Sequence, residues 1–205
     1  MDLWAVLEFS AFLLVVINPV SKMAVLAALS DSHTTRELVD LSLRSTMVGL
    51  VILVTFAFAG RFILQDVFRM KLYSIQFAGG AAIFLIGLNA LREGQFFTFS
   101  AETSLRDLSA APLGMPMIAG PASIAAVIST ANVESAWTAS AAVVPAMAAN
   151  RAIMLVSAQF AAALHRSHFL GPLVRIVGLF IAAIGAEMAL NGLSAWLLAH
   201  GIAAR

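Results

Sequence analysis

The sequence lacks cysteine and contains little charge. No cysteine occurs among its 205 residues, which excludes disulfides and thiolate metal sites. Charged residues make up 11% of the chain, whereas an ordinary soluble domain carries about a quarter. The formal net charge is +1 and no basic cluster stands out, so nothing indicates a partner such as nucleic acid.

Catalytic and metal-binding patterns are also missing. The sequence has no HExxH motif, no GxSxG motif in a plausible context and no glycine-rich phosphate loop, which are the usual signatures of such chemistry. The four histidines, at His33, His165, His168 and His200, lie at the ends of apolar segments or between them. We therefore predict neither an enzyme nor a metal site or other cofactor.

Hydrophobic residues, in contrast, dominate the chain. They make up 61% of it, and the mean hydropathy is +0.94. This composition predicts an all-α, polytopic membrane protein. The N-terminus opens with Asp2 instead of a basic region, and its apolar run exceeds a signal-peptide core, so we expect the first segment to be a permanent span.

Six segments are long and apolar enough to be membrane spans of about 20 residues. They are Leu3–Leu29, Leu38–Leu64, Leu72–Leu91, Pro112–Ala131, Ala136–Leu164 and Leu173–Leu198. We predict one transmembrane domain over residues 1–205, made of a three-helix unit at 1–92, a cytoplasmic loop at 93–111 and a second three-helix unit at 112–205.

Basic residues and tryptophans indicate the orientation. Six basic residues fall on the side of the first, third and fifth loops and four on the opposite side: Arg36, Arg44, Arg92, Arg106, Arg166 and Arg175 against Arg61, Arg69, Lys71 and Arg205. Cytoplasmic loops are enriched in arginine and lysine, so the side with six basic residues should be cytoplasmic. Both termini lie on the other side and should therefore be outside. Trp4, Trp137 and Trp196 would then all lie at the outer interface, where indole rings prefer to sit.

Two of the apolar segments are interrupted by proline. Pro19 lies in the polar stretch Ile17–Lys22, and Pro121 lies in Ile118–Ile124. Proline lacks a backbone donor and clashes with the preceding turn, so each should break its helix. A helix that begins after the break offers free amides to a carboxylate. The alternative is that both prolines are packing kinks, which membrane helices tolerate.

Several polar or small residues cluster at these breaks or on the third span. The candidate substrate-binding residues are Asn18, Pro19, Ser21, Asn89, Gly120, Pro121 and Ser123. Paired broken segments are the best pointer in sequence to a transporter's binding site.

Glycines recur every seven residues in the third and sixth spans. The two series are Gly80, Gly87 and Gly94, and Gly178, Gly185 and Gly192. Asn89 and Glu187 each follow the middle glycine by two. The matched spacing predicts an internal repeat of three spans, and an odd number makes the repeats inverted. The alternative is that small residues line any packed helix pair in lipid.

Three ionisable residues fall inside predicted spans: Lys22, Arg151 and Glu187. Charges in a membrane are costly and usually paired. Arg151 and Glu187 match in depth, counted from the helix ends, and we expect them to form the charge pair. Glu187 is either a titrating coupling carboxylate or half of a structural salt bridge. Lys22 is shallower and either snorkels to the surface or is held deeper by the break.

Four stretches of the sequence are similar to a known protein family. They are Asn18–Lys22, Gly79–Gly87, Pro112–Pro121 and Arg175–Gly192. Through them the chain resembles, nearly end to end, the MarC family of bacterial inner-membrane proteins, the SnatA-type neutral amino acid transporters. The resemblance implies six spans, a cytoplasmic-membrane location and transport of small neutral amino acids such as alanine or glycine.

Some positions depart from the pattern of that family. Ser21 and Lys22 stand where relatives often have Gly-Asn, and Ala122 stands where Gly or Thr is common. Glu187 replaces a usual amide, and Arg151 is also atypical. The resemblance therefore supports the expected fold more strongly than it supports the expected substrate or coupling ion.

The leading functional hypothesis is a secondary transporter that moves a small zwitterion by alternating access. Its partners would be the substrate and the lipid bilayer, with no cofactor and with a proton or sodium ion as coupling ion. The sequence leaves open whether the protein forms a homo-oligomer. The alternatives are an exporter of another small metabolite, as in the related lysine-exporter superfamily, and a non-transporting membrane scaffold.

Overall fold

A computed structural model of the chain describes residues 3–30, 32–94, 117–161, 163 and 170–202. All regular secondary structure in these ranges is helical. The elements are α1 (Leu3–Ile17), α2 (Pro19–Leu29), α3 (Thr35–Arg61), the short π-helix η1 (Phe62–Val67), α4 (Leu72–Glu93), α6 (Pro121–Val133), α7 (Ala136–Gln159) and α9 (Leu170–Ala199).

Among the described residues, five helical segments are long and apolar enough to cross a membrane, which confirms the polytopic architecture. They are Leu3–Leu29, Thr35–Val67, Leu72–Glu93, Ala136–Gln159 and Gly171–Ala199. The fourth predicted span differs, because its described helix α6 begins only at Pro121 and has 13 residues. That length falls short of the roughly 30 Å hydrocarbon core. Residues 112–116 of the predicted span, and most of the predicted loop at 93–111, lie outside the described residues.

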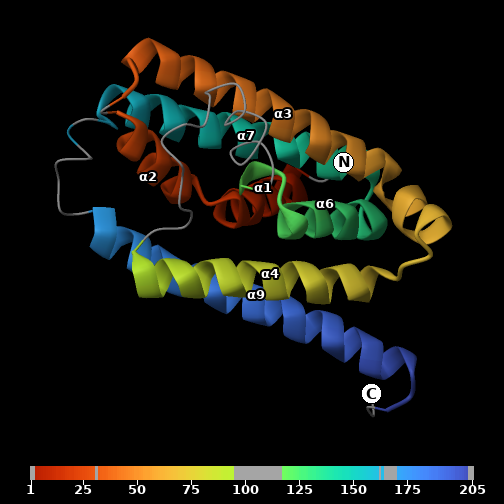
Figure 1. Cartoon of the computed structure of the whole chain (residues 1–205). Coiled ribbons are helices and arrows are strands. Elements are labelled where there is room, and N and C mark those ends of the chain that lie inside the picture. The colour runs from red at the N-terminus through yellow and green to blue at the C-terminus, as the bar shows by residue number, and fades with distance from the viewer. Residues whose placement is uncertain (1–2, 31, 95–116, 162, 164–169, 203–205) are drawn as a thin grey trace.

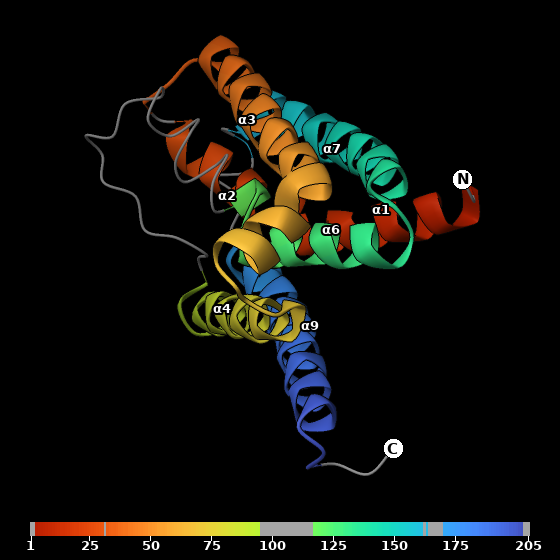
Figure 2. The same cartoon turned by 90° about the vertical axis from the view of Figure 1, so that its right-hand side faces the viewer.

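The helices form two groups, which Figures 1 and 2 show from directions 90° apart. Helices α1, α3, α6 and α7 pack together around a buried cluster that includes Leu13, Leu53, Ile118, Val127 and Met147. Helices α4 and α9 form a long antiparallel pair alongside, which α6 joins to the first group.

The α4–α9 pair is held together at the two glycine series, which is the packing role given as the alternative interpretation of their spacing. A Cβ atom added at Gly80 would lie 2.6 Å from the carbonyl oxygen of Gly185, and one added at Gly87 would lie 2.6 Å from that of Gly178. No side chain fits into such a gap. Glycine therefore allows backbone-to-backbone contact, which is how helices associate where lipid offers no hydrophobic drive.

The contacts of this pair repeat with one fixed offset. Gly80 faces Gly185 and Ala189, while Gly178 faces Gly87 and Leu91. Each partner in α9 lies 98 residues after its counterpart in α4, since Gly178, Gly185 and Ala189 follow Gly80, Gly87 and Leu91 by that number. Exchanging the two helices thus reproduces the same contacts.

The ends of the helices fall at two opposite sides of the molecule. The start of α1, the η1–α4 turn, the α6–α7 turn and the end of α9 lie towards the right of Figure 1, whereas the α2–α3 turn lies at the left. Trp4, Trp137 and Trp196 belong to the right-hand helix ends, and two of them are about three-quarters exposed. This gathering agrees with the single aromatic belt that the sequence indicated.

Candidate functional site

The first proline break is a complete interruption of the helix. α1 ends at Ile17, α2 begins at Pro19, and Asn18 between them has φ 57° and ψ 78°. This left-handed conformation is one that asparagine tolerates better than most residues. The Ser21 hydroxyl donates to the Asn18 carbonyl oxygen at 2.7 Å, which fixes the first turn of α2.

The second break lies where the chain enters α6. Gly120 is extended, Pro121 occupies the first helical turn, and Ile124 donates its amide to the Gly120 carbonyl at 2.9 Å. The amides of Ala122 and Ser123 precede this first helical bond, so they have no partner within the helix. Helix α4 approaches this break closely at Gly79. A Cβ atom added there would lie only 3.1 Å from the Pro121 carbonyl oxygen.

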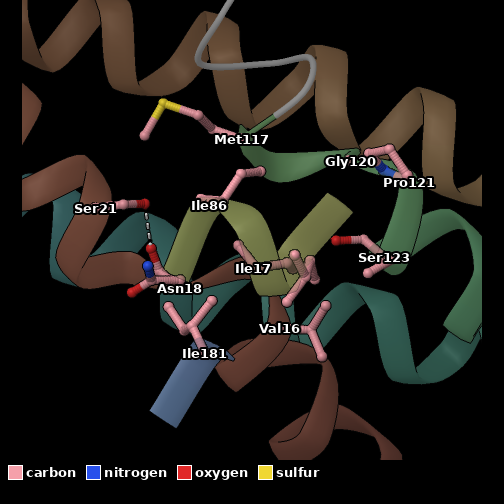
Figure 3. A pocket seen from close by; sticks show the side chains of 12 residues that line it. Val16, Ile17, Asn18, Ser21, Ile86, Met117, Gly120, Pro121, Ser123 and Ile181 are labelled. Atoms are coloured by element: carbon pink, nitrogen blue, oxygen red, sulfur yellow. Dashed lines mark hydrogen bonds between the residues drawn. The ribbon is translucent and has the colours of Figure 1, made fainter. Parts of the chain in front are cut away.

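A small cavity joins the two breaks. It has a volume of about 40 Å³ and is lined by Val16, Ile17, Asn18, Ser21, Ile83, Ile86, Met117, Gly120, Pro121, Ala122, Ser123 and Ile181. In Figure 3, Asn18 and Ser21 lie on one side of it, and Gly120, Pro121 and Ser123 lie on the other. Such a volume holds no more than a few water molecules.

Two helix N-termini point at this cavity. α2 and α6 both begin there, each with proline in its first turn, and each N-terminus carries a partial charge of about +0.5. The Ser123 side chain is buried, and its hydroxyl has no hydrogen-bond partner among the described residues. Figure 3 shows that hydroxyl directed into the cavity. The arrangement can therefore accept the oxygens of a small anionic group.

Lys22 is fully buried directly behind the cavity. Its ammonium donates to the carbonyl oxygens of Ile17, of Asn18 at 3.2 Å and of Met117 at 2.8 Å. All three acceptors line the cavity, whereas Lys22 itself does not. One side chain thus connects the end of α1 with the stretch that leads into α6, and so joins the two breaks.

A comparison with known protein families agrees with these features. A model described as "MarC family integral membrane protein" matches residues 4–197, nearly the whole chain. The protein belongs to the MarC family. It is 33% identical to a UPF0056 membrane protein of Pyrococcus horikoshii over 91% of this chain and 92% of that one. It is 30% identical to a UPF0056 membrane protein of Methanocaldococcus jannaschii over 97% and 100%.

A third relative is the UPF0056 membrane protein YvbG of Bacillus subtilis, at 28% identity over 88% of this chain and 90% of that one. No solved structure matches the chain. The family membership foreseen from the four sequence stretches is confirmed.

In this MarC family member, most of the predicted substrate-binding residues come together. Five of the seven line the cavity, namely Asn18, Ser21, Gly120, Pro121 and Ser123. Pro19 starts α2 beside them without lining it. Asn89 is exposed on α4 and does not line the cavity, because its helix turns that face away from the breaks.

The predicted charge pair is not formed. Arg151 on α7 lines a cleft with Arg36, Glu37 and Asp40 near the start of α3, and its Nη1 atom is buried without a partner. Glu187 on α9 accepts a hydrogen bond from Asn191 at 3.3 Å and belongs to a different opening. Depth along a helix, on which the prediction depended, does not say which helices are neighbours.

Glu187 lines a wide groove instead. The groove has a volume of about 560 Å³ and is lined by Phe9, Phe12, Gln76, Ala125, Ala126, Ser129, Thr130, Ala183, Ile184, Glu187, Met188 and Asn191. These residues lie beyond the cavity lining along α1, α4, α6 and α9, towards the helix ends at the right of Figure 1. Groove and cavity share no lining residue.

Sequence reasoning missed two features of the site. The aliphatic residues Val16, Ile86 and Ile181 are indistinguishable in sequence from ordinary core residues. The Met117 carbonyl carries no side-chain signal at all. The burial of Lys22 at the break is the second of the two positions considered for it from sequence. Lys22 is four residues after Asn18, and helical side chains lean towards the N-terminus, which directs its ammonium back across the break.

Proposed function

We propose that this MarC family protein is a secondary transporter of small neutral amino acids, such as alanine or glycine, that works by alternating access. The observation that carries the proposal is the convergence of two half-helix N-termini, α2 and α6, on one buried cavity. Broken helices that meet near the middle of the membrane are the usual substrate sites of secondary transporters.

The cavity lining matches the chemistry of a small zwitterion. The amides that open α6, together with the Ser123 hydroxyl, would bind the carboxylate. The side-chain oxygen of Asn18 would accept from the ammonium group. Ile83, Ile86 and Ile181 leave little space beside these groups, which favours a methyl group or hydrogen as the substrate's side chain.

The cavity volume of about 40 Å³ suits a closed, substrate-free state, and binding would require the helices around it to separate. The groove that contains Glu187 provides the approach on one side. Opening and closing of this approach, alternating with one on the opposite side, is the motion that the proposal requires.

The proposal includes two inverted three-helix repeats, 1–92 and 112–205, in a cytoplasmic membrane with both termini outside. The fixed offset of 98 residues in the α4–α9 contacts supports it, because two copies related by a two-fold axis in the membrane plane would make these symmetric contacts. The three tryptophans at one end and the six-to-four distribution of basic residues support the orientation.

The coupling ion would be a proton or a sodium ion, and a role in proton coupling would fall to Glu187, the carboxylate that lines the groove. Replacing Glu187 by Gln removes the charge and keeps the shape and the hydrogen bond from Asn191. Transport by the Glu187→Gln variant should lose its pH dependence. An unchanged pH profile would exclude this role.

The test of the proposal is uptake of labelled alanine, glycine and serine by proteoliposomes that contain the purified protein, with and without a proton or sodium gradient. We expect saturable uptake of at least one of the three. If none is taken up in either direction, the amino acid assignment fails, and the alternative of an exporter for another small metabolite becomes the next to test.

A non-transporting scaffold fits the structure less well. Such a protein needs no polar cavity, and its buried polar groups would be packed without space around them. Asn18 and Ser123 line a cavity here, and Glu187 is exposed in a groove.

A further inference from the structure

Lys22 has hydrogen bonds that match its donors one for one. An ammonium group has three N–H donors and no acceptor, and it contacts three carbonyl oxygens, those of Ile17, Asn18 and Met117. The residue is 0% exposed. No carboxylate pairs with it, since the one salt bridge between described residues joins Arg44 to Asp40.

The three acceptors have a common character. Ile17 and Asn18 are the carbonyl end of α1, where the helix carries partial negative charge and lacks its own donors. Met117 and Ile118 are π-helical, and the chain leaves the helical conformation at Ala119 and Gly120 before α6 begins. Carbonyls at unwound ends of broken helices, away from water, are the groups that hold sodium ions in transporters.

We propose that the carbonyls of Ile17, Asn18 and Met117 form a monovalent cation site, and that the ammonium of Lys22 fills it permanently in place of a free ion. The cation neutralises the end of α1 and links the two breaks. Because it is covalently attached, it cannot be released to either side of the membrane.

One consequence concerns coupling, and this consequence rests on the proposed function. A site filled by its own side chain has no use for sodium, so transport through this cavity should not depend on a sodium gradient. The cation site itself needs no transport to be tested. The two ideas can therefore fail separately.

The first experiment measures the thermal-unfolding midpoint in detergent, in sodium chloride and in choline chloride at equal ionic strength. Three variants are compared with the wild type. Lys22→Ala removes the ammonium and leaves space for an ion, while Lys22→Met fills the space without charge. Lys71→Ala is the matched control, because Lys71 is the only other lysine and is exposed.

The wild type and Lys71→Ala should unfold at the same midpoint in both salts. Lys22→Ala should unfold about 5 °C or more lower in choline, since three buried carbonyls lose a charged donor, although that of Asn18 keeps its bond from the Ser21 hydroxyl. Sodium should restore much of that loss, with a saturable dependence on its concentration. Lys22→Met should be lowered in both salts. The proposal is overturned if Lys22→Ala keeps the wild-type midpoint or responds to the two salts alike.

A second experiment uses the wild type and so does not depend on the folding of any variant. Amine-reactive labelling followed by mass spectrometry can separate the two lysine side chains. Lys71 should react quickly, and Lys22 should react only when the protein unfolds, in sodium and in choline alike. Labelling of Lys22 at the rate of Lys71 in the folded protein would contradict the occupied site.

Discussion

At the scale of single residues, the backbone at Asn18 sets the geometry of the first break. Its φ of 57° is favourable only for glycine and, to a lesser degree, for asparagine and aspartate. Asn18 therefore has two separable roles, one in the backbone and one through the amide that lines the cavity. Substitutions can distinguish them.

We expect Asn18→Gly to keep the unfolding midpoint within about 2 °C of the wild type while it weakens substrate uptake. Asn18→Val should lower the midpoint by about 2–8 °C, because a branched side chain pays about 1–2 kcal/mol in the left-handed region. Thermal unfolding and uptake assays on the same preparations measure both. Equal stability of the two variants would show that this conformation is not retained in solution.

The hydroxyl of Ser123 provides a second test at this scale. A hydrogen bond to a charged group contributes about 1.5–3 kcal/mol, so Ser123→Ala should raise the KM for alanine uptake roughly ten-fold or more. Ser45→Ala is a suitable control, since that buried hydroxyl donates to Leu41 within its own helix at 2.8 Å and lies off the cavity. Similar KM values for both variants would remove Ser123 from the substrate site.

At the scale of helices, the breaks and the glycine contacts were predictable from sequence, whereas the charge contacts were not. Proline removes a backbone donor whatever surrounds it, so Pro19 and Pro121 mark helix starts by local chemistry alone. The seven-residue glycine spacing likewise permits a close helix contact, which the sequence offered as the alternative to an internal repeat. Both are properties of the chain itself.

The partners of Arg151, Glu187 and Lys22 depend instead on which helices become neighbours. The depths counted along the helices made Arg151 and Glu187 seem matched, but these residues face different openings. Lys22 is fully buried and does not reach the surface, because its ammonium binds the carbonyls freed at the break. Backbone acceptors such as Met117 leave no mark in a sequence.

The helix contact itself can be tested at Gly87. A Cβ atom there would lie 2.6 Å from the Gly178 carbonyl oxygen, so Gly87→Ala should force α4 and α9 apart. Overpacking of this kind costs about 1–3 kcal/mol, which corresponds to a fall of several degrees in the unfolding midpoint.

Gly171→Ala is the matched control for that variant. It lies in α9, and nothing comes within 4 Å of an added Cβ, so alanine there should leave the midpoint unchanged or raise it slightly. If Gly87→Ala is as stable as Gly171→Ala, the two helices are not in backbone contact.

At the scale of the whole molecule, the account requires a groove that opens to the side of the chain termini. The absence of cysteine makes this directly testable with single introduced thiols. Ser129→Cys lies in the groove, and Ser32→Cys lies in the exposed α2–α3 turn at the opposite side.

A membrane-impermeant maleimide added to intact cells should label Ser129→Cys and spare Ser32→Cys, which should react only after the cells are opened. The reverse pattern would place both termini inside the cell. Protection of Ser129→Cys by alanine would further connect the groove with the substrate pathway.

The central claim is that a small neutral amino acid passes through the cavity between the two breaks. Counterflow in proteoliposomes tests it most directly, with unlabelled alanine inside and a trace of labelled alanine outside. The account predicts transient accumulation of label by the wild type and none by Ser123→Leu, whose larger side chain fills the cavity of about 40 Å³. Equal accumulation by folded Ser123→Leu, or no accumulation by the wild type, would contradict it.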